Sequence, residues 1–200
     1  MTNPSLFFAT PVWASKIENY ETVNEEIYKY IINLQQSDKD GIIKSNIKGW
    51  HSKDFNLNDK EALSFVKLIT PSIEKVINDM NWDTTKQVAK ITSMWAIINK
   101  GGASNARHHH GNSSISAAYY VRAPKNCGEI VFYDPRPAPV YSHPFAIAPN
   151  SLNAMVNSVT PSEGVLVLFP SYLDHSVNPN LSNDERIVIS FNINLISKNS

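Results

Sequence analysis

From about residue 87, short runs rich in apolar residues are separated by Gly, Pro, Asn and Asp at roughly even spacing. Such runs predict the strands of an antiparallel sandwich or barrel, because strands are short and turn residues punctuate them. The predicted strands are QVAKITSMWAIIN, SISAAYYV, GEIVFYD, SLNAMVN, GVLVLFP and ERIVISFNINL. We therefore expect residues 87–200 to form a β-rich core.

The last of these runs alternates strictly. Its odd positions are apolar, namely Ile187, Ile189, Phe191, Ile193 and Leu195. Its even positions are mostly polar and include Arg186 and Asn192. Since successive side chains point to opposite faces of a strand, one face should pack on a core under N-terminal helices. The other face should look into water or a wet cavity.

The first 86 residues predict helices. Residues 21–35 place Val23, Ile27, Ile31 and Leu34 at helical spacing. A second helix should begin after Asn58 or Asp59, with Pro71 splitting or kinking it. Its expected apolar stripe is Leu63, Val66, Leu68, Ile73, Val76 and Ile77.

The N-terminal run Leu6–Trp13 is a candidate edge strand, interrupted at Pro11, which cannot donate to a ladder. We read residues 1–200 as one domain, with a strand and helices over 1–86 and a core over 87–200. The predicted fold class is α+β, mainly β, with the N-terminal helices packed on a sheet.

Composition narrows the function. The 200 residues are 42% hydrophobic, and 18 basic residues balance 18 acidic ones, so the net charge is zero. This balance argues against a broad nucleic-acid or anionic-membrane surface. A single cysteine, Cys127, favours a reducing compartment, and no signal peptide or long apolar span is evident, so we expect a cytoplasmic protein. A homo-oligomer stays possible.

Histidines carry the candidate chemistry. The six are His51, His108, His109, His110, His143 and His175. None has a carboxylate two residues later, so the usual two-His-one-carboxylate iron motif is absent. What remains is His108-x-His110 with His175 far downstream. Ser116 and Tyr120 share the parity of His108 and His110, which would place them on one face if the strand extended that far back.

Arg186 opens the last strand on its polar face, where a buried guanidinium is a preformed fork for a carboxylate. A metal held by histidines would chelate one end of a small dicarboxylate, and Arg186 would form an ion pair with the other end. Taken alone, the three adjacent histidines would indicate a surface loop, and Arg186 would be a surface charge that pairs with Asp184 or Glu185. His51 and His143 lie in polar or Pro-rich contexts and are expected to be structural.

The runs HHHGNSSISAAYYV, GEIVFYDPR, LFPSYLDHSVNPN and ERIVISFNI resemble the 2-oxoglutarate/Fe(II)-dependent oxygenase family, distantly related to prolyl hydroxylases. LFFATPVW and SNIKGWHS resemble the opening of that family, so the likeness spans nearly the whole chain. The resemblance implies a double-stranded β-helix, also called a jelly roll. It also implies a hydroxylase that uses Fe(II) and the cosubstrate 2-oxoglutarate.

Carried onto this sequence, the resemblance makes His108, His110 and His175 the metal ligands and Arg186 the residue that binds the distal carboxylate of 2-oxoglutarate. Further candidates for lining that pocket are Tyr120, Ser116 and Asn192, and for facing the substrate Arg136 and Asn112.

Alternatives stay open. Zinc also accepts three histidines, His109 could replace a neighbouring ligand, and such a site could work without 2-oxoglutarate. A jelly roll can also be a non-catalytic binding or structural module. A nucleophilic hydrolase is disfavoured, because the chain has no G-x-S-x-G elbow and Cys127 has no activating neighbours in sequence. The primary substrate, a small molecule or a peptide, is not readable.

Overall fold

The computed structural model describes residues 3–136 and 144–198. Over these residues the chain forms two helices and eleven strands. In order they are β1 (Trp13–Lys16), α1 (Glu21–Ser37), β2 (Asn46–Ile47), β3 (Trp50–His51), α2 (Lys60–Asp79), β4 (Gln87–Asn99), β5 (Ser104–His108), β6 (Ile115–Arg122), β7 (Ile130–Tyr133), β8 (Val156–Val159), β9 (Val165–Pro170), β10 (His175–Val177) and β11 (Arg186–Ser197).

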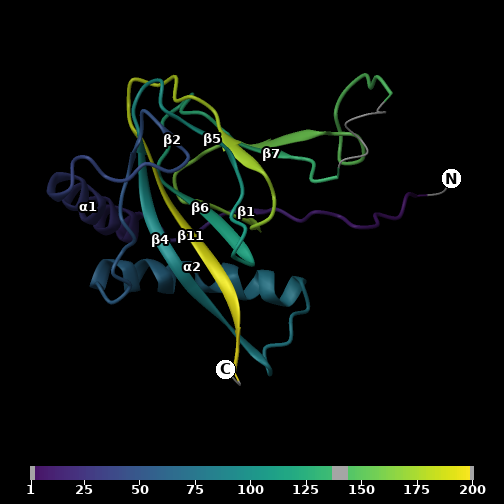
Figure 1. The fold of residues 1–200 in the computed structure, drawn as a ribbon, viewed down its shortest axis with the longest axis horizontal. Coiled ribbons are helices and arrows are strands. Elements are labelled where there is room, and N and C mark those ends of the chain that lie inside the picture. The colour runs from purple at the N-terminus through teal and green to yellow at the C-terminus, as the bar shows by residue number, and fades with distance from the viewer. Residues whose placement is uncertain (1–2, 137–143, 199–200) are drawn as a thin grey trace.

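The strands form two antiparallel sheets. The larger sheet has the order β1-β9-β6-β11-β4-β3, and the smaller has the order β2-β5-β10-β7-β8. Neighbours in each sheet are often far apart in sequence, as in a jelly roll. Figure 1 shows the long strands β4 and β11 running side by side, with both helices on one side of the larger sheet. The predicted fold class is confirmed.

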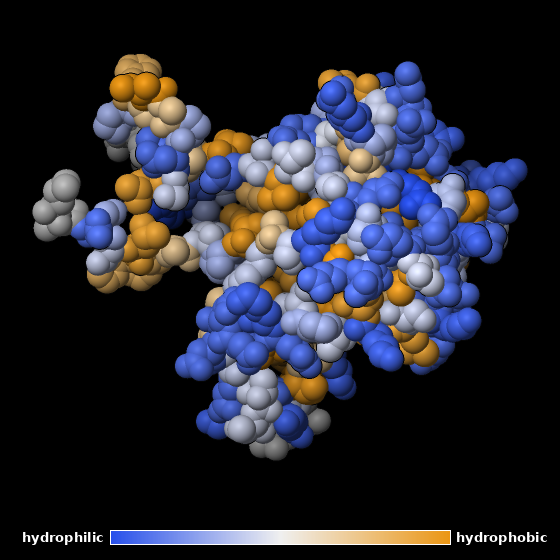
Figure 2. Space-filling view, turned by 180° about the vertical axis from the view of Figure 1, so that it is seen from behind, coloured by the Kyte–Doolittle hydropathy of each residue, from blue (hydrophilic) through white to orange (hydrophobic). Residues whose placement is uncertain are grey.

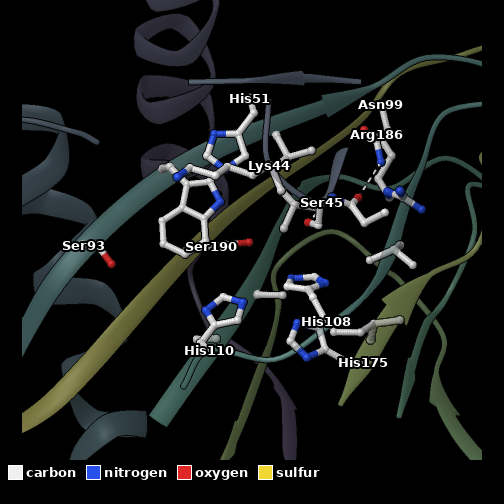
Figure 3. A pocket seen from close by; sticks show the side chains of 18 of the residues that line it. Lys44, Ser45, His51, Ser93, Asn99, His108, His110, His175, Arg186 and Ser190 are labelled. Atoms are coloured by element: carbon white, nitrogen blue, oxygen red, sulfur yellow. Dashed lines mark hydrogen bonds between the residues drawn. The ribbon is translucent and has the colours of Figure 1, made fainter. Parts of the chain in front are cut away.

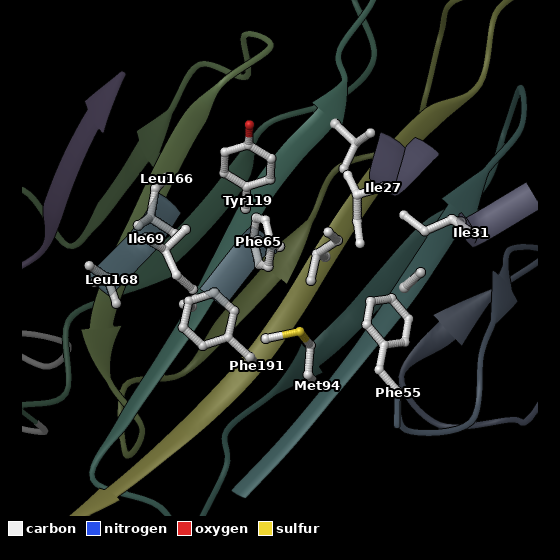
Figure 4. Close-up of a cluster of buried hydrophobic side chains, with 14 of the residues drawn as sticks. Ile27, Ile31, Phe55, Phe65, Ile69, Met94, Tyr119, Leu166, Leu168 and Phe191 are labelled. Carbon is white, nitrogen blue, oxygen red and sulfur yellow. The ribbon is translucent and has the colours of Figure 1, made fainter. Parts of the chain in front are cut away.

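The helices cover the outer face of the larger sheet. Ile27 and Ile31 of α1, Phe65 and Ile69 of α2, and the predicted odd face of β11 meet in one buried cluster (Figure 4). Phe65 packs edge-on against Tyr119 of β6, with ring centroids 4.9 Å apart. The alternation in 186–195 therefore predicted correctly which face of this strand packs under the helices.

The inner face of the larger sheet packs on the smaller sheet. Tyr120, Phe169 and Val188 of the larger sheet share a second buried cluster with Ile130 and Phe132 of the smaller one. Each central strand thus sends alternate side chains to two different cores. Residues at the end of this inter-sheet layer are polar, and the candidate site lies there.

The N-terminal strand lies later than predicted. Leu6–Trp13 is not a strand; the edge strand is β1, and only Trp13 belongs to both. β1 pairs with β9, so the edge position was predicted correctly. Residues 6–12 are not in a strand, and Phe8 adopts a positive φ of 59°, which does not fit an extended ladder.

The second helix differs in two respects from its prediction. It runs unbroken from Lys60 to Asp79 through Pro71. Pro71 and Lys67, whose carbonyl loses its helical donor, are both exposed, so solvent can satisfy that carbonyl. The buried stripe also differs, because Leu63 is exposed. The buried residues are Ala62, Phe65, Ile69, Ile73 and Val76.

The segment SLNAMVN is mostly a turn, and β8 begins only at Val156. Asn150 and Asn153 bond to nearby backbone N–H groups or carbonyls, which competes with strand pairing. Four short strands were not predicted: β2, β3, β5 and β10. They are polar and two to five residues long, too short to show a clear alternation.

Exposed apolar side chains gather on two segments that project from the body, at the left in Figure 2. One carries Leu6, Phe7 and Phe8, and the other Phe145 and Ile147. Within residues 3–136 and 144–198, no helix is both long and apolar enough to cross a membrane.

Candidate functional site

A cavity of about 500 Å³ opens between the two sheets (Figure 3). Odd-numbered residues of β4, even-numbered residues of β11, and residues of β5, β6, β7 and β10 line it. Among its lining residues are Lys44, His51, Trp95, Asn99, His108, His110, Tyr120, His175, Arg186 and Ser190. The three sequence-predicted metal ligands and the predicted carboxylate-binding arginine therefore share one cavity.

The sheet register brings the histidines together. His108 ends β5 and lies directly opposite His175 of β10, as paired residues of neighbouring strands. His110 follows in the turn after β5, where its N–H donates to the carbonyl of Ser171. One potential ligand atom from each of the three side chains lies within 4.8 Å of the other two. Two nitrogens bonded to one ion at about 2.1 Å are at most about 4.2 Å apart, so small ring rotations suffice.

The outer nitrogens of the three rings are already bonded to oxygens. Nδ1 of His108 lies 2.8 Å from the carbonyl oxygen of Ala106, and Nδ1 of His175 lies 3.0 Å from that of Leu173. Nδ1 of His110 lies 2.7 Å from Oδ1 of Asn192. Since these oxygens accept, each Nδ1 carries the proton and each Nε2 is left with a free lone pair. The three Nε2 atoms are thus the atoms that could bind a metal.

Burial favours the neutral rings. Removal from solvent lowers the pKa of His108 and of His110, and it lowers the pKa of His175 to about 3. The neighbouring histidine rings add to the effect at His175. The neutral form is the one that binds a metal ion, so the site is electrostatically prepared for a cation.

Asn192 and Ser116 lie behind His110 instead of bordering the described part of the cavity. Oδ1 of Asn192 also accepts from the Ser116 hydroxyl at 2.8 Å, and its Nδ2 donates to Oγ of Ser93 at 3.0 Å. This network fixes which way the Asn192 amide points, and therefore the orientation of the His110 ring. Their contact with the cosubstrate stays a prediction; the contact that the structure describes is with the metal-ligand candidate His110.

Arg186 is held in the cavity wall at 1% exposure. Its Nη1 donates to the carbonyls of Cys127, Gly128 and Asn178, the last two at 2.8 and 3.3 Å. Its Nη2 is buried and has no hydrogen-bond partner among the described residues. An unpaired buried donor is costly, and a ligand carboxylate in the cavity would satisfy it. Tyr120 borders the same region, where burial raises its pKa and keeps it a neutral hydroxyl.

Gly128 is a site residue that sequence reasoning missed. It adopts φ +88°, and a Cβ there would lie 2.8 Å from Nη1 of Arg186 and 2.2 Å from the carbonyl oxygen of Asn178. A side chain would therefore push the guanidinium out of its carbonyl cradle. The turn sequence Asn126-Cys127-Gly128 was the available signal, because Asn and Gly are the residues that most readily adopt a positive φ, as both do here.

Other predicted residues lie outside the cavity. His109 faces the other way, with Nδ1 3.1 Å from Oδ1 of Asp174, so the ligand set that the geometry assembles excludes it. Arg136 is exposed and pairs with Asp134, and the exposed Asn112 accepts from Asn194. Neither borders the described part of the cavity, and their contact with a substrate stays a prediction. His51 is buried, as expected, and His143 lies outside the described residues.

The extended conformation does not reach from β6 back to the histidines, as the shared parity had suggested. A turn at 111–114 separates β5 from β6, and the two strands belong to different sheets. The histidines of the smaller sheet face Tyr120 because the inner faces of the two sheets face each other.

Comparison with known proteins agrees with this arrangement. Residues 93–192, half of the chain, match the family model described as "Putative 2OG-Fe(II) oxygenase". The chain belongs to this family. Its cofactors are accordingly Fe(II) and 2-oxoglutarate, and the matched segment contains every residue of the histidine cluster together with Arg186. No curated protein sequence matches the chain.

Solved structures resemble the fold at low identity. A Pseudomonas putida prolyl-4-hydroxylase superposes with a TM-score of 0.67 at 11% identity, covering 92% of each chain. A prolyl hydroxylase from Trichoplax adhaerens, in complex with a hypoxia inducible factor peptide, gives 0.61 at 14%, covering 94% of this chain and 84% of that one. HygX from Streptomyces hygroscopicus, with nickel, 2-oxoglutarate and hygromycin B bound, gives 0.63 at 11%, covering 93% and 83%. These likenesses show the double-stranded β-helix fold.

Proposed function

We propose that this oxygenase hydroxylates a C–H bond, with His108, His110 and His175 holding Fe(II) and Arg186 holding 2-oxoglutarate. The observation that carries the proposal is the unpartnered Nη2 of Arg186 in the same cavity as three unprotonated Nε2 atoms. The histidines would be enough for a site that binds a metal ion and nothing else. A buried guanidinium with one free edge, across the same cavity, adds a second point of attachment suited to a dicarboxylate.

The residues share out three tasks. The histidines offer three neutral ligands, which leave open positions on an ion that accepts six. Arg186 pairs with the distal carboxylate of 2-oxoglutarate and so orients the keto acid end toward the ion. The apolar side chains beside it, including Ile130 and Val188, limit water around that ion pair and so strengthen it.

When bound, Fe(II) and 2-oxoglutarate supply the oxidising chemistry: the keto acid and O2 yield succinate and CO2, and the second oxygen atom enters the substrate C–H bond as a hydroxyl. The protein orients those groups, excludes water from around them and provides charges that complement theirs.

An anaerobic titration tests the proposal. Fe(II) is added to metal-free protein, 2-oxoglutarate follows, and the visible charge-transfer band of a chelated keto acid is recorded. A saturable band is expected for the wild type. Arg186→Met should bind Fe(II) normally and require at least about thirtyfold more 2-oxoglutarate, because loss of a buried charge partner costs about 2 kcal/mol or more.

Arg122→Met is the matched control, since Arg122 lies on the neighbouring strand and pairs with Glu25 of α1. Its titration should resemble that of the wild type. Bound iron without a band would point to a three-histidine enzyme that does not use 2-oxoglutarate. Failure to bind iron or zinc would favour a non-catalytic module.

A further inference from the structure

The cavity is larger than the cosubstrate requires. Liquid water occupies about 30 Å³ per molecule, and at that generous allowance the ten non-hydrogen atoms of 2-oxoglutarate fill about 300 Å³. The cavity measures about 500 Å³. The end of the cavity around His51 is lined by Ile42, Lys44, His51, Asp54 and Trp95. Neither the metal nor the cosubstrate uses these side chains.

Trp95 carries a buried donor in the wall of the cavity. Its ring is stacked between His51, at a centroid distance of 5.6 Å, and His110, at 5.8 Å. The stacking prevents the indole from turning, so the direction of its N–H is set. Nε1 is buried and has no acceptor among the described residues. An acceptor oxygen of a ligand in the cavity would satisfy this donor.

Two opposite charges flank His51 at the same end. Lys44 and Asp54 both line the cavity, and both act electrostatically on the His51 ring. Neither is salt-bridged to the other or to any other described residue. Lys53, which also lines the cavity, differs, because its ammonium lies 2.9 Å from the Asp38 carboxylate. The free charges at this end are therefore one cation and one anion.

We propose that this end binds the primary substrate, and that the substrate is a zwitterion of the α-amino acid class. Lys44 and the N–H of Trp95 bind its carboxylate, and Asp54 binds its ammonium group. A monoanion would meet Asp54 unfavourably and a cation would meet Lys44 unfavourably, whereas a zwitterion pairs with both. Ile42 and Ile97 beside His51 would contact an apolar substrate side chain.

That this ligand is hydroxylated rests on the proposed function, but its binding does not. The experiment therefore measures binding to the full chain. The probes are the free L-amino acids, each compared with its N-acetyl derivative, which lacks the ammonium group, and its carboxamide, which lacks the carboxylate. Thermal unfolding is recorded without metal and again with Zn(II) and 2-oxoglutarate, where no turnover occurs.

At least one free amino acid should raise the unfolding midpoint, by about 5–10 °C at a hundredfold excess over its Kd. Both derivatives should bind at least about tenfold more weakly, as expected for the loss of a charge-assisted hydrogen bond. Lys44→Gln, Asp54→Asn and Trp95→Phe should each weaken binding of the free amino acid. Lys53→Gln is the matched control and should leave the Kd within about twofold.

The 2-oxoglutarate affinity is measured in every variant and should not change with Lys44 or Asp54. If 2-oxoglutarate stabilises the protein and no amino acid does, the substrate proposal is wrong and the proposed function stands. An amino acid that binds as well as its carboxamide, or loses as much affinity in Lys53→Gln as in Lys44→Gln, also overturns the substrate proposal. Amino acid binding without any 2-oxoglutarate binding would overturn the proposed function alone.

Discussion

At the residue scale, the groups behind the histidine rings decide which nitrogen is free. Two of the three acceptors are backbone carbonyls within two residues of their own histidine, so the local chain supplies them. The third is the side chain of Asn192, 82 residues from His110 in sequence. The orientation of His110 therefore depends on a side chain of another strand, and that dependence can be tested.

Asn192→Ala should lower Fe(II) or Zn(II) affinity by about 10–100-fold, because the group that holds the Nδ1 proton of His110 is lost. Metal titration followed by calorimetry measures this. Asn194→Ala is the control: it removes the same residue type from the same strand, where Oδ1 accepts only from the N–H of Ser114 near the turn. Equal metal affinities in the two variants would contradict a positioning role for Asn192.

Stability should depend on pH through His51. Burial lowers its pKa in the folded chain, against the opposing effect of the contact between its Nδ1 and the Ser52 carbonyl. Unfolded, the group has a pKa of about 6.5. The unfolded chain therefore binds more protons below that pH, and the stabilising contribution present above pH 6.5 is lost as the pH falls.

Urea unfolding of the wild type and of His51→Gln between pH 8 and pH 5 measures this contribution. Below pH 6.5 the free energy of unfolding should fall more steeply with decreasing pH in the wild type than in His51→Gln. The difference between the two slopes should be up to about 1.4 kcal/mol per pH unit. Parallel profiles would show that His51 titrates alike in the folded and unfolded chains.

At the scale of elements, the site depends on pieces of chain too short to be recognised in sequence. β10 has three residues and β5 has five, and their pairing puts His108 opposite His175. Neither run has the length or alternation that predicts a strand, so the resemblance, and not periodicity, indicated these ligands. The long strands β4 and β11 were predicted within two residues, because burial on alternate faces leaves a clear pattern.

The turn before β7 should affect 2-oxoglutarate binding, because its Gly128 lies against the guanidinium of Arg186. Gly128→Ala should raise the Kd for 2-oxoglutarate and lower the unfolding midpoint, because its Cβ cannot fit between Arg186 and the Asn178 carbonyl and φ is +88°. Gly102→Ala is the control, since φ is also positive there, +79°, but no atom of the described residues beyond its chain neighbours lies within 4 Å of the added Cβ. A change in stability alone, the same in both variants, would mean that only backbone strain matters.

At the scale of the whole molecule, the larger sheet separates two environments. Phe191 lies between the helices and the sheet at 0% exposure, and the next residue, Asn192, faces the histidines. The helices thus stabilise the sheet from one side while the other side remains available for a polar cavity.

Phe191→Ala should destabilise the protein by about 3–5 kcal/mol, as expected for a buried aromatic side chain. In thermal unfolding this corresponds to a midpoint about 6–20 °C lower. Leu181→Ala, at a side chain that is 79% exposed, should change stability by no more than about 0.5 kcal/mol. Similar losses for both would contradict the placement of the main core under the helices.

The sequence by itself determined the mainly β class, the long strands, both helices and the family resemblance, because these depend on patterns within one segment. The position of His109 between two ligands of an extended segment already predicted that its side chain points away from them. Only the tertiary structure decided that Asn192 lies behind His110. It alone decided that Nη2 of Arg186 has no partner in the part of the chain that the structure describes. These depend on contacts between residues of different strands or turns, and a one-dimensional pattern contains no information on which distant groups meet. The same holds for Trp95, whose N–H is directed by two histidines on either side of it.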